Sequence, residues 1–380
     1  MNMGIIAASR LRATGISPFI IEVDTTKAGT PSDQFQFTGA VGDYDVVAKQ
    51  NGTQVATFND LSGQETITLP SSGIYVLEVI PKEVNGFNRI AFDNEGDRRK
   101  LTDIKQWGDV VWSSFSESFF GCSNMLTTAT DIPNLSNVTN MSNMFRNTSS
   151  ANPDTINWDV SSVTNMGAMF RDATSANPDT SNWDVSSVTI MYAMFFAASS
   201  ANPDTSNWDV SNVTNMGQMF RDASSANPDT SNWDVSNVNS MFLMFYGISS
   251  ANPDVSNWDV SSVTNMRSMF QSASSANPDT TNWDVSSVTD MGFMFYFASS
   301  ANPDTTNWDV SSVTNMSFMF RDSNLSEENL TACYENWSQL NLQQNVSFGA
   351  GSTKYNNSGQ SGRNIMVVQY NWSITDGGQA

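Results

Sequence analysis

Two periods of apolar and polar residues follow one another along the chain. Residues 18–80 alternate apolar and polar side chains in short runs such as "PFIIEVD" and "GIYVLEVI", separated by Gly, Ser, Asn and Asp. A period of two is typical of strands that bury one face, and the intervening residues favour turns. The first part of the chain therefore predicts a small all-β sandwich.

The second pattern recurs every 25 residues. Seven regular copies place a tryptophan at the same position, namely Trp158, Trp183, Trp208, Trp233, Trp258, Trp283 and Trp308. Self-similarity at this period is the signature of a repeat solenoid, in which each coil buries its apolar face only against its neighbours. Both ends of such an array need caps.

Within one copy, two spacings succeed each other. Trp158 and Val160 are two residues apart, as on one face of a strand, whereas the next apolar residues are spaced as on one face of a helix: Val163, Met166, Met169, Phe170 and Ala173. Ser161 or Ser162 is a suitable helix N-cap. We therefore expect a leucine-rich-repeat-like solenoid, with one short parallel strand and one short helix or 3₁₀ segment per coil.

These patterns predict five segments. They are an N-terminal arm (1–17), a β-sandwich domain (18–87), an N-terminal cap with a degenerate coil (88–150), seven 25-residue repeats (151–323) and a C-terminal cap (324–380).

The charge balance restricts the partners. Lys and Arg total 17 against 38 Asp and Glu, which gives a net charge of −21. Such a surface repels phosphate backbones and anionic headgroups, so we expect neither nucleic-acid binding nor direct membrane insertion. The N-terminal sequence "MNMGIIAASRLRATG" has an apolar run too short for a signal-peptide core. We therefore expect the chain to be made in the cytoplasm.

Residues that carry catalysis are scarce. The chain has no histidine, and it has neither a Gly-rich phosphate loop, nor G-x-S-x-G, nor a metal motif of His or Cys. Seven equivalent copies of each repeat carboxylate argue against a unique acid and base pair. The two cysteines, Cys122 and Cys333, bracket the repeats and are predicted to be free, buried thiols. We expect a protein that is not an enzyme and needs no cofactor.

One aspartate per repeat lies between two apolar strand positions and should point outward. The column consists of Asp159, Asp184, Asp209, Asp234, Asp259, Asp284 and Asp309. Stacked carboxylates about 5 Å apart repel one another by roughly 1 to 3 kcal/mol. Hydrogen bonds from Asn, Ser or backbone N–H groups would offset this repulsion, and bridging Ca²⁺ is the alternative.

Near-identical repeats differ mainly at the positions of Asn165, Gly167, Ala168, Arg171 and Asp172. At 100° per residue these positions form the exposed face of the expected helix. If these positions varied only because packing does not constrain them, small polar residues would be favoured there. Several repeats instead carry large apolar ones: Tyr192, Phe196, Phe242, Leu243, Tyr246, Phe293, Tyr296, Phe297 and Phe318. Exposed aromatic residues gathered in this way mark an interface, so we expect these side chains to bind a ligand.

The repeat "WDVSSVTNMGAMFRDA" resembles the BspA-type bacterial surface repeat, and the resemblance covers about residues 88–380, including "YNWSITDGG" near the C-terminus. Upstream, "SSGIYVLEVI" is similar to the last strands of PKD and immunoglobulin-like modules. The repeat resemblance implies a binding protein on the surface of a cell or virion.

The absence of a signal peptide favours a phage or phage-like virion component, such as a fibre, receptor-binding or decoration protein. Its partners would be a host-surface glycan or protein and, through the N-terminal domain, other virion or assembly subunits. A secreted bacterial adhesin is one alternative. A purely structural spacer, with its aromatic face covered by a neighbouring subunit, is another.

Overall fold

The computed structural model describes residues 15–83 and 86–380, so most of the expected N-terminal arm lies outside the described residues. The chain divides into two compact units, Met1–Ser187 and Val188–Ala380.

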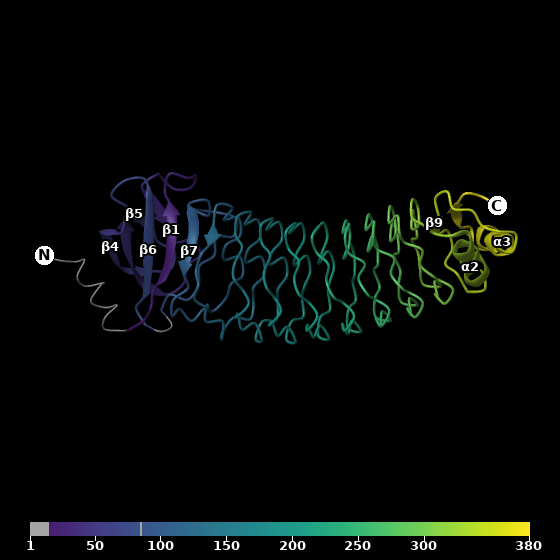
Figure 1. Ribbon diagram of the computed structural model, residues 1–380, viewed down its shortest axis with the longest axis horizontal. Helices are drawn as coiled ribbons and strands as arrows, with labels where there is room; N and C mark the ends of the chain where they lie inside the picture. Colours follow the sequence, from purple (N-terminus) through teal and green to yellow (C-terminus); the bar gives the residue numbers. More distant parts are fainter. Residues whose placement is uncertain (1–14, 84–85) are drawn as a thin grey trace. The chain divides into compact units, whose positions relative to one another are not determined.

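The first unit begins with a six-stranded sheet in the order β4-β3-β6-β1-β7-β8 (Figure 1). Its strands are β1 (Phe19–Asp24), β3 (Asp43–Gln50), β4 (Thr53–Ser62), β6 (Ile74–Pro81), β7 (Leu101–Gln106) and β8 (Leu126–Thr127). A separate antiparallel pair consists of β2 (Gln34–Gln36) and β5 (Thr66–Thr68). Alternate residues of β1 are buried, as the period of two predicts.

Strand pairing in the large sheet changes from antiparallel to parallel at its last two strands. β7 runs antiparallel to β1, but β8 runs parallel to β7. Further parallel bridges join Val111 to Asn134 and Asn140 to Asn165. The sheet is therefore mixed, and it includes strands beyond residue 87. The expected all-β sandwich as a separate N-terminal fold is wrong, because β1, β3, β4 and β6 share one mixed sheet with β7 and β8, while β2 and β5 pair apart from it.

The expected leucine-rich-repeat-like solenoid is also wrong, because residues 151–323 contain neither helices nor extended strands. The helix-like spacing comes from successive turns. The amide of Met169 donates to the carbonyl of Met166 at 3.2 Å, and that of Ala173 donates to Phe170 at 3.0 Å. Ala168 and Asp172 have φ of 54° and 58°. A positive φ at the third position defines a type II turn and cannot continue a right-handed helix.

Apolar residues spaced by three fit these turns as well as they fit a helix. The Trp, Val, Met and Phe columns of the repeats are all buried. Hydrogen bonds join one repeat to the next within each unit. In the first unit, the amide of Phe145 donates to the carbonyl of Met169 at 2.8 Å. In the second, the Phe245 amide donates to Met269 at 2.9 Å, and the Phe245 and Phe270 rings stack with centroids 5.5 Å apart.

The second unit ends in α2 (Glu327–Trp337), β9 (Ser347–Gly349), α3 (Gly359–Tyr370) and β10 (Ser373–Thr375) (Figure 1). Ser326 caps the N-terminus of α2, since its side chain accepts a hydrogen bond from the Asn329 amide, and β9 pairs with β10 in parallel. α2 and α3 are the only helices in the described residues. Neither is long and apolar enough to span a bilayer.

Candidate recognition surface

All nine candidate ligand-binding residues lie in the second unit, but their exposure differs. Phe297, Phe318 and Tyr192 are 50%, 43% and 36% exposed, whereas Leu243 is buried at 8%. The other five, Phe196, Phe242, Tyr246, Phe293 and Tyr296, are half-buried. Leu243 therefore presents almost no surface to a ligand, and the remaining eight are accessible to different degrees.

Four of the candidates form one group, which we call the C-terminal aromatic cluster: Phe293, Tyr296, Phe297 and Phe318. The Phe293 ring lies 5.1 Å from that of Phe318 and 5.5 Å from that of Tyr296. The Tyr296 and Phe297 ring centroids are 4.3 Å apart. Aromatic pairs at such distances attract one another, so the rings are held in place before a ligand arrives.

Two arginines cover this cluster. The guanidinium carbon of Arg267 lies 4.9 Å from the Phe293 ring centroid. That of Arg321 lies 5.6 Å from Phe318 and 5.9 Å from Tyr296. These are cation–π distances. The two arginines were not among the residues expected from sequence, although both occupy variable positions of the repeat. The chain has only 17 basic residues, so two arginines at variable positions near variable aromatic residues were the signal from which their part in this surface could have been predicted.

The turn geometry explains how bulky residues come to the surface here. Phe293, Phe297 and Phe318 have φ of 60°, 58° and 57°, which is the left-handed region. For a residue with a Cβ this conformation costs about 1–2 kcal/mol. It is uncommon for a bulky side chain. The same position is left-handed at Ala168, Gln218 and Leu243, so the conformation belongs to the repeat turn rather than to this cluster alone. The neighbouring Met and Phe residues stay buried while these rings point outward.

A second group of candidates surrounds Arg221. Its guanidinium carbon lies 4.8 Å from the Phe196 ring and 5.1 Å from the Tyr246 ring. Arg221 also donates to Gln218, which in turn donates to the Tyr192 hydroxyl. This group contains more polar contacts than the C-terminal aromatic cluster, and less of its aromatic surface is open.

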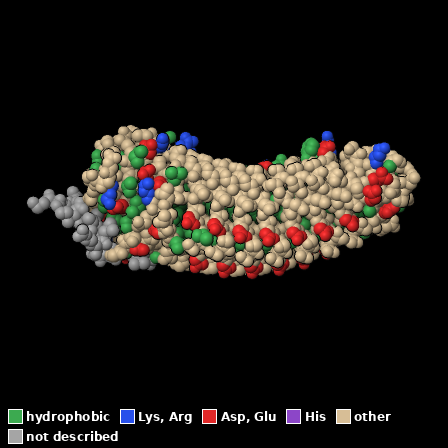
Figure 2. All heavy atoms as spheres, viewed as in Figure 1, with side chains coloured by type: hydrophobic (Ala, Val, Ile, Leu, Met, Phe, Trp, Pro, Cys, Tyr) green, Lys and Arg blue, Asp and Glu red, His purple; other side chains and the backbone are tan. Residues whose placement is uncertain are grey.

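The aspartate column is accounted for by short-range hydrogen bonds. Six of the seven residues are exposed and Asp309 is half-buried. In each case one carboxylate oxygen accepts the amide of the residue two positions later: Ser161, Ser186, Ser211, Ser236, Ser261, Ser286 and Ser311. Hydrogen bonds from the hydroxyl and then the amide of Ser161 hold the pKa of Asp159 below its usual value. In Figure 2 acidic side chains recur at regular intervals over the repeats.

These contacts match the hydrogen-bond alternative stated for the column. The described residues contain no group of three or more His, Cys, Asp or Glu placed to hold a metal ion. A second aspartate recurs five residues earlier in each repeat, beginning at Asp154, and it behaves in the same way: the Asp179 carboxylate accepts the amide of Ser181 at 3.1 Å. Each aspartate therefore stabilises its own turn.

The prediction of two free, buried cysteines is confirmed. Burial raises the pKa of Cys333 to about 12 and that of Cys122 well above its ordinary value. Both thiols are therefore protonated at neutral pH, and the thiolate that acts as a nucleophile or metal ligand does not form.

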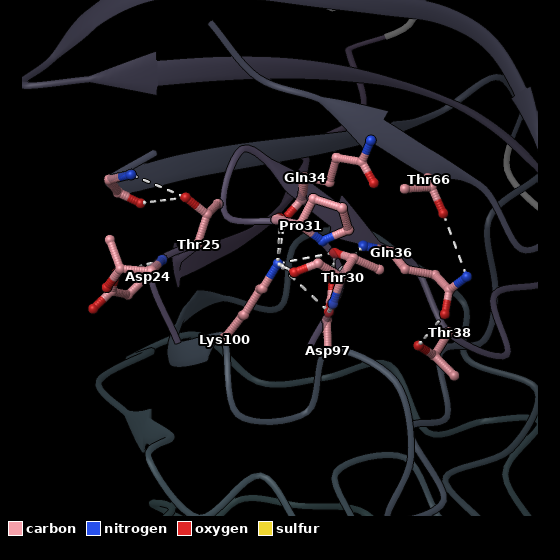
Figure 3. A network of polar contacts seen from close by, with 12 residues as sticks. Asp24, Thr25, Thr30, Pro31, Gln34, Gln36, Thr38, Thr66, Asp97 and Lys100 are labelled. Carbon is pink, nitrogen blue, oxygen red and sulfur yellow. Dashed lines mark hydrogen bonds and ion pairs between the residues drawn. The ribbon is translucent and has the colours of Figure 1, made fainter. Parts of the chain in front are cut away.

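A buried ion pair that the sequence did not indicate lies in the first unit (Figure 3). The side chains of Lys100 and Asp97 are fully buried, with Nζ and Oδ1 3.7 Å apart. Lys100 donates to the carbonyls of Thr30, Pro31 and Gln34, and Asp97 accepts from the amides of Thr30 and Gln36. These bonds fasten β2 and the residues just before it to the segment before β7. Both side chains are buried and hydrogen-bonded to the main chain of residues 30–36, so the pair has a structural role.

The fold and the surface thus define a repeat protein that presents clustered aromatic and arginine side chains. Residues 113–233 and 215–334 each match a family model described as "Mycoplasma protein of unknown function, DUF285". Together the matches span more than half of the chain, so the chain belongs to this family. The match is consistent with the resemblance to BspA-type surface repeats, whereas neither a leucine-rich-repeat nor an immunoglobulin-like family was matched. No curated protein and no solved structure matched the chain.

Proposed function

We propose that this protein is a non-enzymatic recognition protein of a virion or cell surface, and that it attaches to its ligand through the C-terminal aromatic cluster. The observation that carries the proposal is the exposure of Phe297 and Phe318 beside the half-buried Phe293 and Tyr296. Aromatic side chains with few rotatable bonds supply large contact area at low entropic cost.

The electrostatics of the cluster support the same function. Arg267 and Arg321 lie against the aromatic rings, and each is also paired with an aspartate, Asp290 and Asp322 respectively. Arginine and aromatic residues are the types enriched at binding hot spots. A host-surface glycan or protein is the partner that this chemistry fits. The BspA-type resemblance of the repeats favours the same placement on a surface.

The test is attachment of the purified, labelled chain to a panel of intact bacterial and animal cells. Changing Tyr296→Ser and Phe297→Ser together should weaken attachment by about 1–4 kcal/mol without unfolding the chain, because neither side chain belongs to the buried columns. Asp209→Ala with Asp234→Ala is the matched control on the aspartate column.

Three results would redirect the proposal. Normal attachment by the aromatic variant would overturn it. Loss of attachment only in the aspartate variant would assign binding to the aspartate column. If neither pair changes attachment but the aromatic variant dissociates an assembly, the protein is a structural spacer. Antibody labelling of intact virions and intact cells would distinguish the two surfaces on which the protein could be displayed.

A further inference from the structure

A cavity of about 330 Å³ adjoins the C-terminal aromatic cluster within the second unit. One wall consists of Phe318, Arg321 and Asp322 from the last regular repeat. The rest of the lining comes from the three residues of β9, from Gly351 and Ser352, and from Thr375 of β10. The cavity thus forms where the 25-residue pattern ends and the C-terminal elements begin.

The backbone holds these walls at a fixed separation. The Phe320 amide donates to the Gly349 carbonyl at 2.8 Å, and the Ala350 amide donates to the Thr375 carbonyl at 2.8 Å. A Cβ at Gly349 would lie 2.6 Å from the backbone nitrogen of Phe318, so only glycine permits this approach. The hydrogen bonds and the close contact make the cavity a feature of the main chain, formed before any ligand binds.

The lining combines three kinds of group. Phe318 is partly exposed and contributes aromatic surface, while the Phe293 ring stacks against it. Arg321 and Asp322 form an ion pair of 3.3 Å, with each side chain about half exposed. Ser352 and Thr375 add exposed hydroxyl groups on the opposite side. The cavity therefore offers an apolar face, paired charges of opposite sign, and neutral donors and acceptors.

This chemistry selects against several ligands. An anion would meet the carboxylate of Asp322, and a cation would meet Arg321. A wholly apolar ligand would cover the ion pair and hydroxyls without replacing their hydrogen bonds to water, which is unfavourable. A neutral ligand with one apolar face and several hydroxyl groups suits all three kinds of lining. The volume lies at the lower end of the range for small-molecule sites, about 300–1,000 Å³.

We propose that this cavity binds one or two rings of a neutral saccharide, an inference that rests on the proposed recognition function and names its ligand class. The C–H face of a sugar ring packs on Phe318, while the sugar hydroxyls donate to Asp322 and accept from Arg321. Arg321 is already held over the Phe318 and Tyr296 rings, so little of its freedom is lost on binding. The aromatic cluster next to the cavity extends the contact to further sugar units.

The test uses methyl glycosides of glucose, galactose, mannose, N-acetylglucosamine and N-acetylgalactosamine, together with their common disaccharides, measured by saturation-transfer NMR and calorimetry on the full chain. At least one probe should bind. Phe318→Ala and Asp322→Asn should each weaken that probe at least tenfold. Thr375→Trp, which fills the cavity from an exposed strand position, should abolish binding. Val368→Trp, at an 83% exposed position on α3 outside the cavity, should leave binding unchanged.

The inference is overturned if none of the probes binds, or if a bound probe is unaffected by Thr375→Trp. Preference for a peptide over every sugar would also overturn it. Phe318 belongs to both the cavity and the C-terminal aromatic cluster, so the proposed function is tested separately on Tyr296 and Phe297, which belong to the cluster but do not line the cavity. Normal cell attachment by the Thr375→Trp variant, with attachment lost in the Tyr296 and Phe297 variant, would retain the recognition function and remove the saccharide cavity.

Discussion

Phe293 and Phe318 occupy the same position in successive repeats, and their rings stack with centroids 5.1 Å apart and planes inclined by 30°. Their φ angles are 60° and 57°. The Phe293 amide also donates to the carbonyl of Ser317 at 2.8 Å. Main-chain register therefore sets the distance between the two rings. The C-terminal aromatic cluster is a consequence of placing large residues at turn positions that the backbone already aligns.

At the left-handed positions, we expect Gly→Ala and Ala→Gly substitutions to change stability by different amounts. Gly247 has φ of 71°, and a Cβ there would lie 2.5 Å from an Asp222 carboxylate oxygen. Gly247→Ala should lower the free energy of unfolding by about 1–2 kcal/mol, because the added Cβ meets the Asp222 carboxylate and is also strained at this φ. Ala197 holds the equivalent position with φ of 52°. Ala197→Gly should change stability by less than about 0.5 kcal/mol, because relief of strain is offset by greater freedom of the unfolded chain.

Urea midpoints at an unchanged denaturant slope measure both changes. Ala198→Gly is the control, since it removes a buried methyl group at a neighbouring position that has no positive φ. If Gly247→Ala unfolds at the wild-type midpoint, the left-handed turn carries no strain and the argument from φ is wrong.

We expect the stability of the second unit to depend on the shape of the cationic group at position 221, and not only on its charge. Its guanidinium lies between the rings of Phe196 and Tyr246, where a planar group stacks and a compact ammonium does not. Both Arg221→Lys and Arg221→Gln should lower stability by about 0.5–1 kcal/mol. Thermal melts of these variants are compared with Lys354→Gln, which removes an exposed cation from the same unit. Full rescue by lysine would show that charge alone matters.

Asp159 predicts a measurable pKa difference. Its carboxylate accepts the Ser161 hydroxyl at 2.6 Å and the Ser161 amide at 3.2 Å, which lowers the pKa. A pKa that is lower in the folded state contributes stability above about pH 4, and this contribution is lost as the pH falls through the folded-state pKa. The gain per residue is small because the group is exposed. Carboxyl NMR titration should show a higher pKa in Ser161→Ala, while Ser162→Ala leaves it unchanged.

Calcium is expected to have little effect on stability. One oxygen of each column aspartate already accepts an amide hydrogen bond, so the repulsion between stacked carboxylates is offset without a metal. Melting temperatures in millimolar calcium and in chelator should agree within error. A rise with calcium concentration would follow mass action and would assign the column to metal binding.

Burial could be predicted from the sequence, but secondary structure in the repeats could not. Trp158, Met166 and Phe170 are buried because their spacing places them on one side of the chain. A spacing of three arises from type II turns as well as from a helix. The residues that distinguish the two are the left-handed ones, and these are Ala168, Gln218 and Leu243 in different repeats. None of these residue types favours a positive φ, but a second left-handed position four residues later holds Asp172, Asp222 and Gly247, which are residue types that do. That second position was the signal available for the turn.

The candidate surface was predicted in part. The aromatic residues could be identified because they replace small or polar residues at positions where the repeats are otherwise nearly identical. Leu243 was included wrongly, since it shares the left-handed position of Phe293 but is buried. The cavity could not be predicted, because Phe318 and Thr375 are distant in sequence and meet only through the pairing of β9 with β10.

The hydrogen bonds between repeats have a genetic consequence. The amides of Phe220 and Phe245 each donate to a methionine carbonyl 24 residues further on, Met244 and Met269. These repeats therefore present the same donors and acceptors as their neighbours, so loss or gain of 25 codons among them rejoins equivalent main-chain atoms. Near-identical repeats are also where unequal recombination occurs between aligned DNA copies. Recombination can thus replace one repeat, with its aromatic or small surface residues, by another. The surface then changes while the main chain that supports it stays the same.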